Sequence, residues 1–172
     1  MKHSLEKYIR DVSDFPTEGI LFKDITTLLE NPQAFKEATS ALYEPVREME
    51  IDKVVGIEAR GFIFGALLAD KLSAGFVPVR KPGKLPYKTL KESYALEYGT
   101  DSLEIHQGAI KEGERVLIHD DLLATGGTAK AACKLVEKLG GQVVLVSFLL
   151  ELTFLNGREK LPEYKINSVI KY

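Results

Sequence analysis

Apolar and polar positions along this chain predict strands and helices in alternation. A strand spans KVVGIEA from Lys53 and continues into RGFIFGALLADKL, where Phe62, Ala66 and Ala69 share one helical face. Gly75 is expected to stop this helix, and FVPVRK is the next strand. Strand, helix and strand in close succession predict a parallel sheet with a right-handed crossover.

The same pattern occurs again further along the chain. A strand is predicted from Arg115 to His119, then a helix from about Thr128 that Gly140-Gly141 ends. QVVLVSFLLEL follows, and its nearly continuous apolar run is typical of a strand covered on both faces. Two such units predict an α/β fold with a doubly wound, mostly parallel sheet flanked by helices.

The remaining segments are less regular. Ser4 to Ile9 predicts a short amphipathic helix, which precedes the turn-rich DFPTEG and the apolar run ILFKDITTLL. Asn31-Pro32 predicts a helix start, and Pro45 should end that helix near Glu44. Residues 81–108 predict a long exposed loop that is a lid, a binding loop or a disordered segment. SYALEYG and DSLEIHQ could pair as a hairpin around Gly99-Thr100.

Composition narrows the class of protein. The 172 residues carry a formal charge of −2, which removes the simplest case for nucleic-acid binding, and they predict a single domain over 1–172. No apolar run is long enough to cross a membrane, and the N-terminus lacks a signal-peptide pattern, so we expect a cytoplasmic protein without membrane contact. The one cysteine, Cys133, lies among alanines and is expected to be packed.

The densest chemical signal is VLIHDDLLATGGT, Val116 to Thr128. An apolar strand runs into Asp120 and Asp121, and small and hydroxylated residues then lead to a helix. A phosphate fits at such a helix start, because free N–H groups and the positive end of the helix dipole meet there. The two carboxylates would repel it unless they serve sugar hydroxyls or a hydrated Mg²⁺. Helix capping or solvent exposure of the acids is the alternative.

A second turn, GIEARG, carries Glu58 and Arg60 at the same predicted sheet edge. Its glycine spacing matches a P-loop, but Phe62 and Ile63 stand where that motif requires Lys and Ser or Thr. Two anion-competent turns at one edge indicate a ligand with two phosphate groups. A structural salt bridge of Arg60 is the other interpretation.

These motifs resemble the type I phosphoribosyltransferases. VLIHDDLLATGGT is similar to their 5-phosphoribosyl-1-pyrophosphate (PRPP) motif, and LLATGGT resembles the form found in adenine phosphoribosyltransferases. Four further segments match in the same order: FPTEGILFKDITTLL, GIEARGFIFG, VRKPGKLPYKTLKESYALEYG and LLELTFLNGREKL. The resemblance implies a type I phosphoribosyltransferase fold with a mobile lid over about residues 81–101 and a small hood formed by the N-terminal segment.

The implied reaction transfers the 5-phosphoribosyl group from PRPP to N9 of adenine, giving AMP and pyrophosphate in purine salvage. The resemblance also implies Mg²⁺ as cofactor, held mainly through PRPP and water near Asp120 and Asp121, and a homodimer. A close relative acting on another 6-substituted purine is an alternative. A PRPP-sensing regulator is another, and it predicts a basic patch and loss of the lid residues.

The resemblance implies roles for particular residues in PRPP binding. Asp120 and Asp121 match the acids that hold the ribose hydroxyls. Ala59 and Arg60 match the pyrophosphate loop, with a cis peptide between them, and Arg80 and Lys84 match cationic contacts to pyrophosphate. The loop that binds the 5-phosphate is matched by Ala124, Thr125, Gly126, Gly127 and Thr128.

Further matches concern catalysis. Glu97 and Arg60 are the candidate catalytic residues. Glu97 would manage the adenine proton or stabilise positive charge, unless it forms only a salt bridge with a loop lysine. Tyr98 would bind PRPP and order the closed lid. His119 could tune Asp120 electrostatically or be an ordinary sheet histidine.

The remaining matches concern the base. Phe22 matches the residue that stacks on adenine, and Leu152 the apolar contact on the opposite face. Backbone groups of Leu21 and Lys23 would read the hydrogen-bonding edge of the base. Without the resemblance, Phe22 would be assigned to the core.

Overall fold

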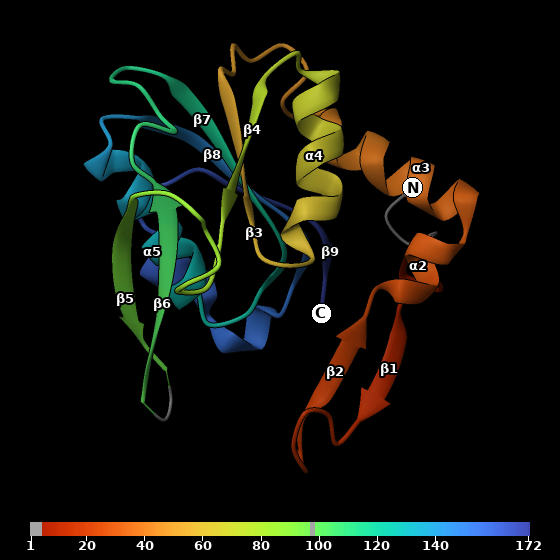
Figure 1. Ribbon diagram of the computed structural model, residues 1–172. Coiled ribbons are helices and arrows are strands. Elements are labelled where there is room, and N and C mark those ends of the chain that lie inside the picture. Colours follow the sequence, from red (N-terminus) through yellow and green to blue (C-terminus); the bar gives the residue numbers. More distant parts are fainter. Residues whose placement is uncertain (1–4, 97–98) are drawn as a thin grey trace.

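The computed structural model describes residues 5–96 and 99–172, and a five-stranded parallel sheet forms its centre (Figure 1). The strand order is β4-β3-β7-β8-β9, so the predicted, mostly parallel sheet is confirmed. The strands are β3 (Lys53–Ile57), β4 (Gly75–Val79), β7 (Arg115–Leu123), β8 (Gln142–Glu151) and β9 (Ile166–Lys171).

Helices cover both faces of this sheet. The helices α3 (Pro32–Tyr43) and α4 (Gly61–Lys71) lie on one face and α5 (Gly127–Lys138) lies on the other (Figure 1). Successive strand residues serve opposite faces: Leu117 joins the core under α3 and α4, whereas Ile118 joins the core under α5. Because both faces are buried, the strands need nearly continuous apolar sequence, as β8 has.

The boundaries of α3 follow from its sequence. Pro32 is the first helical residue, and the side chain of Asn31 accepts the N–H of Ala34 at 2.9 Å. The helix ends with Glu44 as its C-cap, directly before Pro45, so the predicted start and stop are both confirmed.

The predicted stop of α4 at Gly75 is wrong. The helix ends at Lys71, and the left-handed conformation that follows it is adopted by Ser73, with φ 51°. Gly75 is instead the first residue of β4. A Cβ atom there would lie 3.0 Å from Cδ of Lys53, which belongs to a flexible side chain on the neighbouring strand.

Residues 81–108 are more regular than the predicted loop. Strands β5 (Thr89–Ala95) and β6 (Thr100–His106) form an antiparallel hairpin, which confirms the pairing of SYALEYG with DSLEIHQ. The strand begins earlier than the sequence indicated, because Leu90 and Tyr94 alternate onto the core under α5, which Leu103 of β6 also joins.

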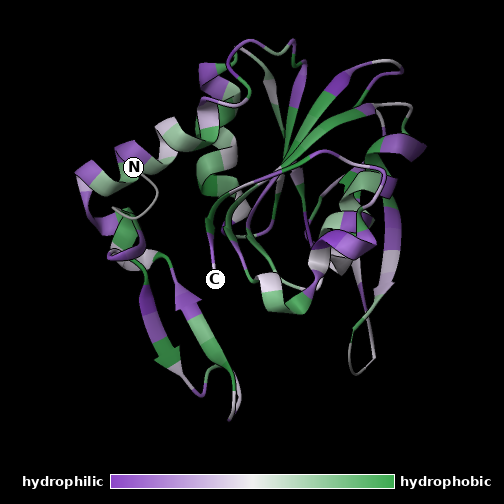
Figure 2. Ribbon diagram, turned by 180° about the vertical axis from the view of Figure 1, so that it is seen from behind, coloured by the Kyte–Doolittle hydropathy of each residue, from purple (hydrophilic) through white to green (hydrophobic). Residues whose placement is uncertain are grey.

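The N-terminal part forms a separate hairpin of β1 (Arg10–Ser13) and β2 (Leu21–Asp24), followed by α2 (Thr26–Glu30). Figures 1 and 2 show this hairpin extending away from the central sheet. ILFKDITTLL is therefore divided between a strand and a short helix. The predicted helix from Ser4 to Ile9 lies partly outside the described residues. Within the described part of the chain, no helix has the length and apolar character needed to span a membrane.

Candidate active site

The candidate site lies where β3 and β7 end. These neighbouring strands run parallel, so the turn from β3 into α4 and the turn from β7 into α5 lie at the same edge of the sheet. An ion pair joins the start of α4 to strand β7, because Nε of Arg60 lies 2.6 Å from Oδ2 of Asp121. The salt bridge considered for Arg60 is therefore present.

The acidic pair lies within β7, not after it. The predicted strand end at His119 is wrong, because pairing with β8 continues to Leu123 opposite Glu151. The side chain of Asp121 is only 7% exposed, whereas Asp120 is half-buried and its Oδ1 accepts the Asp121 N–H at 2.8 Å. Because Asp120 and Asp121 are strand residues, they do not cap the helix that follows.

Asp120 is held in a crowded environment at the start of α4. A Cβ atom on Gly61 would lie 3.0 Å from Oδ1 of Asp120 and 2.9 Å from the carbonyl oxygen of His119. Burial raises the pKa of Asp120 well above its usual range, and the adjacent charge of Asp121 raises it further. Hydroxyl donors or a cation at this position would favour the ionised carboxylate.

The turn before α5 is made of backbone. Gly126 is the N-cap of the helix with φ 83°, and no side chain caps the N-terminus. A Cβ atom on Gly126 would lie 2.4 Å from the carbonyl oxygen of Gly157, and one on Gly157 would lie 2.3 Å from the carbonyl oxygen of Ala124. The two segments approach too closely for side chains, and the first N–H groups of α5 remain available to an anion.

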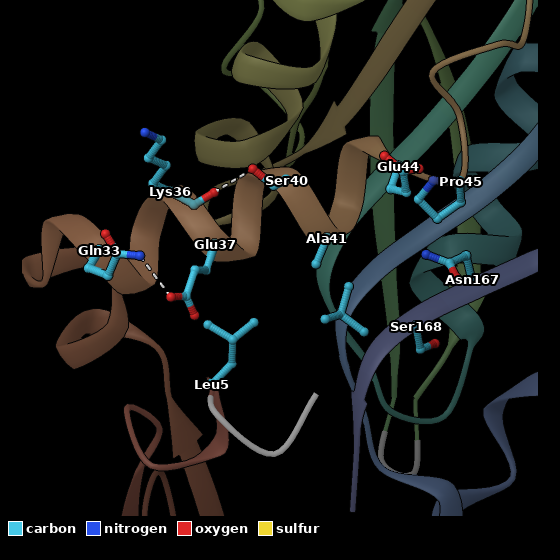
Figure 3. A pocket seen from close by; sticks show the side chains of 11 residues that line it. Leu5, Gln33, Lys36, Glu37, Ser40, Ala41, Glu44, Pro45, Asn167 and Ser168 are labelled. Carbon is cyan, nitrogen blue, oxygen red and sulfur yellow. Dashed lines mark hydrogen bonds between the residues drawn. The ribbon is translucent and has the colours of Figure 1, made fainter. Parts of the chain in front are cut away.

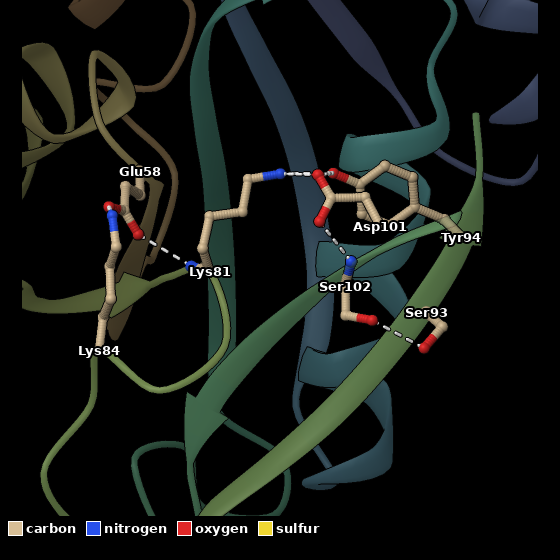
Figure 4. Close-up of polar contacts among 7 residues, drawn as sticks. All are labelled: Glu58, Lys81, Lys84, Ser93, Tyr94, Asp101 and Ser102. Carbon is tan, nitrogen blue, oxygen red and sulfur yellow. Dashed lines mark hydrogen bonds and ion pairs between the residues drawn. The ribbon is translucent and has the colours of Figure 1, made fainter. Parts of the chain in front are cut away.

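Ion pairs and hydrogen bonds of Glu58 dominate the turn after β3. Glu58 accepts the N–H of Lys81 at 2.8 Å and pairs with Nζ of Lys84 (Figure 4). It also accepts a hydrogen bond from Nη2 of Arg80 at 3.2 Å. Burial alone would raise the pKa of Glu58, but these hydrogen bonds outweigh it and lower the pKa to about 2. The sequence had placed Glu58 at this edge without a role.

The cis peptide of this turn is not where the resemblance implied. It joins Glu58 to Ala59, and the bond between Ala59 and Arg60 is not the cis one. Strand β3 ends at Ile57, two residues before the predicted end at Ala59, and Arg60 is the N-cap of α4.

The N-terminal hairpin contributes an aromatic face. Phe22, on β2, is half-buried, and Phe15 packs edge-on against it with ring centroids 5.0 Å apart. Cζ of Arg60 lies 5.0 Å from the centre of the Phe22 ring. Phe22 is therefore at the site and not in the central core.

The other residues predicted to contact the base lie around this aromatic face. The Lys23 ammonium lies 2.6 Å from Asp11 and 3.9 Å from the centre of the Tyr172 ring, so its side chain is already engaged. Leu21 is exposed. Leu152 follows β8, and its N–H donates to Leu123 at 3.0 Å, which places it at the same sheet edge as the acidic pair.

Glu97 and Tyr98 lie outside the described residues. The hairpin that carries them reaches the turn before α5, because a Cβ atom on Gly127 would lie 3.3 Å from Cδ2 of Tyr94. Near the loop end of this hairpin, where Tyr94 pairs with Asp101, Lys81 forms an ion pair with Asp101 and donates to the Tyr94 hydroxyl at 3.1 Å (Figure 4).

Two other side chains are buried near the site. Burial lowers the pKa of His119 to about 3, so this histidine is neutral, and its ring faces Phe64 of α4 with centroids 6.3 Å apart. Cys133 is buried in α5, and burial raises the pKa of its thiol to about 12, in agreement with the predicted packing role.

A cavity of about 650 Å³ lies elsewhere, between α3 and β9 (Figure 3). Lys36 and Glu37 of α3 and Asn167 of β9 belong to its lining, which shares no residue with the candidate site. Over residues 5–96 and 99–172, no group of three or more His, Cys, Asp or Glu side chains could hold a metal ion by itself.

Comparisons with known proteins agree with this arrangement. Residues 24–170 match the family model described as phosphoribosyl transferase domain. An adenine phosphoribosyltransferase of Flavobacterium johnsoniae is 62% identical and is covered to 99%, with 98% of this chain aligned. The crystal structure of the enzyme from Thermoanaerobacter pseudethanolicus superposes with a TM-score of 0.97 at 55% identity, covering 100% of both chains.

A eukaryotic structure is also similar. The Saccharomyces cerevisiae adenine phosphoribosyltransferase, crystallised with adenine and D-2,5-dideoxy-2,5-imino-altritol 1,6-bisphosphate, has a TM-score of 0.92 at 43% identity. The alignment covers 98% of each chain.

Proposed function

This chain belongs to the adenine phosphoribosyltransferase family, and on that premise we propose that it transfers the 5-phosphoribosyl group of PRPP to N9 of adenine. The products are AMP and pyrophosphate. The observation that carries the proposal is that two different anion-binding features lie at one sheet edge. One is the uncapped start of α5, and the other is a cluster of cations, of which Arg60 pairs with Asp121 of β7. PRPP needs both, because it carries a phosphate at one end and a pyrophosphate at the other.

The 5-phosphate would bind the turn before α5. Backbone N–H groups and the dipole of a 12-residue helix meet there, and two threonine hydroxyls can add donors. The proposed residues are Ala124, Thr125, Gly126, Gly127 and Thr128.

The pyrophosphate would bind the charged turn. Arg60, Arg80 and Lys84 supply positive charge, Ala59 supplies backbone, and Arg60 is the residue of this group that the acidic pair already holds. In this proposal Arg60 exchanges Asp121 for a pyrophosphate oxygen, which stabilises the leaving group. Asp121 is then released to accept a ribose hydroxyl.

Mg²⁺ fits this site as a partner of the substrate. The described residues offer no cage of three acidic or histidine ligands, but Asp120 and Asp121 present carboxylates beside the place proposed for ribose and pyrophosphate. These acids would hold the ion through water and PRPP. Bound there, Mg²⁺ would supply neutralisation of pyrophosphate charge.

Adenine would bind between the hairpin and the sheet edge. Phe22 would stack on one face after Arg60 moves from its ring, and Leu152 would contact the other face. Strand β2 pairs with β1 along one edge only in this two-stranded sheet. Its other edge would let backbone groups of Leu21 and Lys23 read the base, which distinguishes an amino from an oxo group more sharply than shape does.

In the reaction, the bond from C1′ to the pyrophosphate oxygen breaks, a bond from C1′ to N9 forms, and N9 loses its proton. The positive charge that develops on the ribose must be protected from water, and the β5–β6 hairpin is the proposed lid over residues 81–101. Glu97 is the proposed group that receives the proton or stabilises the charge, and Tyr98 is proposed to order the closed lid.

We further propose that the enzyme is a cytoplasmic homodimer of single-domain chains. Sedimentation velocity of the purified protein tests the dimer. A mass close to the 19.1 kDa of one chain would contradict it.

The function is tested by incubating the purified protein with Mg²⁺, PRPP and adenine, hypoxanthine or guanine in separate reactions. AMP should form from adenine far faster than IMP or GMP forms from the 6-oxopurines. Absence of AMP would refute the proposal, and comparable rates with hypoxanthine or guanine would refute the base specificity alone.

A further inference from the structure

Glu58 gathers donors from a single segment of the chain. Its side chain is 8% exposed, and it accepts the backbone N–H of Lys81 and pairs with Lys84 (Figure 4). Arg80 also donates to it, so all three donors come from the five residues that follow β4. No other carboxylate among the described residues is bonded to both Arg80 and Lys84.

Glu58 and the two cations differ in their exposure to solvent. Glu58 directly follows the buried strand β3 and is 8% exposed, and a carboxylate only accepts hydrogen bonds, so it does not itself bind a phosphate. The side chains of Arg80 and Lys84 are 34% and 49% exposed, although Nε of Arg80 is buried. Without a carboxylate at this point, two neighbouring cations would repel one another and the segment would lose the bond at the Lys81 N–H.

We infer that Glu58 is a positioning residue, which holds Arg80 and Lys84 in the geometry that receives the pyrophosphate of PRPP. The inference rests on the proposed function. A guanidinium has five N–H donors and an ammonium has three, so both cations can keep Glu58 and still donate to a phosphate oxygen. Cations ordered before binding lose less conformational entropy when the ligand arrives.

The opposite role for Glu58 would be competition with pyrophosphate for the same cations. In that case, removal of the Glu58 charge would tighten PRPP binding. The spare donors of the cations and the low exposure of the carboxylate favour positioning, which predicts weaker binding, so one measurement separates the two roles.

The test is Glu58→Gln, which keeps an acceptor for the Lys81 N–H and removes the charge. We expect KM for PRPP to rise at least about tenfold, while kcat and KM for adenine change less than about threefold. Glu58→Asp retains the charge and should raise KM for PRPP by less. Thermal unfolding of each variant checks that it is folded.

Glu104→Gln is the matched control. Glu104 accepts the Gly83 N–H of the same segment at 3.2 Å, and KM for PRPP should stay within about twofold of wild type in its variant. A double-mutant cycle adds a second readout: in a Lys84→Met background, the effect of Glu58→Gln on KM should shrink to a few-fold. A merely structural role of Glu58 would leave the two effects independent.

An unchanged or lower KM for PRPP in Glu58→Gln would overturn the inference, and so would full additivity in the cycle. If wild type forms no AMP, the proposed function fails separately. Calorimetric titration of pyrophosphate onto wild type and Glu58→Gln then decides the inference, with weaker binding to the variant supporting it and equal binding overturning it.

Discussion

The two turns at the sheet edge are both suited to bind an anionic group, but one uses backbone groups and the other uses charged side chains. The turn after β7 uses backbone: Gly126 touches Gly157, and the start of α5 lacks a side-chain cap. The turn after β3 uses charged side chains: Glu58 holds Arg80, and Arg60 reaches across to Asp121. The turn after β7 therefore has its shape without ligand. In the turn after β3, the charged side chains are paired with one another, and we expect the ligand to replace Asp121 as the partner of Arg60.

This difference predicts different responses to mutation. Backbone that fits by close approach tolerates no added atom, so single glycine replacements should be severe. When one charge of an ion-pair network is removed, the remaining side chains can form other pairs. Single charge variants should therefore lose only part of the affinity for the substrate. It also explains why a chain with a formal charge of −2 can serve a strongly anionic substrate, since positive potential is supplied locally.

The largest effect should come from Gly126→Ala. A Cβ atom would lie 2.4 Å from the Gly157 carbonyl oxygen, and φ of 83° disfavours any residue other than glycine. We expect kcat/KM for PRPP to fall by at least about a thousandfold, because the phosphate loop must move away from Gly157. Steady-state kinetics with varied PRPP measure it.

Gly108→Ala is the control for backbone strain. Gly108 has φ 82°, but a Cβ atom there would meet nothing within 4 Å. This variant should lose about 1 kcal/mol of stability and keep its kinetics. Similar kinetic losses in both glycine variants would show that strain, and not the approach of Gly157, limits the turn.

A smaller loss should follow from Asp121→Asn, which removes the charge that pairs with Arg60. We expect kcat/KM to fall by about a hundredfold, because the variant loses a ribose acceptor and leaves Arg60 without its partner. Glu163→Gln, which breaks the surface pair of Lys130 with Glu163, is the control and should change kcat/KM by less than about twofold. Wild-type kinetics in Asp121→Asn would remove Asp121 from the site.

The order of elements could be predicted from the sequence because periodicity reports burial directly. The βαβ units, the capped start of α3 and the hairpin at Gly99 all follow from local pattern and turn chemistry. The stop at Gly75 failed because Ser73 adopts the left-handed conformation after α4, which glycine usually adopts.

The site was predictable in part. The residues of the two turns could be located because parallel strands bring their ends to one edge. The bond pattern of Glu58 could not, since its three donors come from residues 80–84 across a helix and a strand, and no spacing rule connects them. The contact of Gly126 with Gly157 was equally hidden, because sequence does not report close backbone approach between distant segments.

Phe22→Ala tests the aromatic face that the charged turn reaches through Arg60. Loss of base stacking should raise KM for adenine about tenfold and leave KM for PRPP within about threefold. Tyr43→Ala is the control, since the Tyr43 ring packs with Lys71 at the C-terminal end of α4, opposite the end that reaches the site, and its kinetics should be unchanged. A rise in KM for PRPP as large as that for adenine would assign Phe22 to the support of Arg60 instead.

The smallest expected effect is a pH dependence of stability that comes from Glu58 in the turn after β3. The pKa of Glu58 is lowered from 4.5 to about 2 on folding, so its ionised form stabilises the native state above pH 4.5, and this stabilisation is lost as pH falls toward 2. Because Lys84 is 49% exposed, solvent screens the pair, and we expect the loss to be on the order of 1 kcal/mol. Urea unfolding of wild type and Glu58→Gln between pH 7 and pH 2 measures it as a narrowing of their stability difference. A difference between wild type and Glu58→Gln that stays constant with pH would mean that the Glu58 charge does not contribute to the fold.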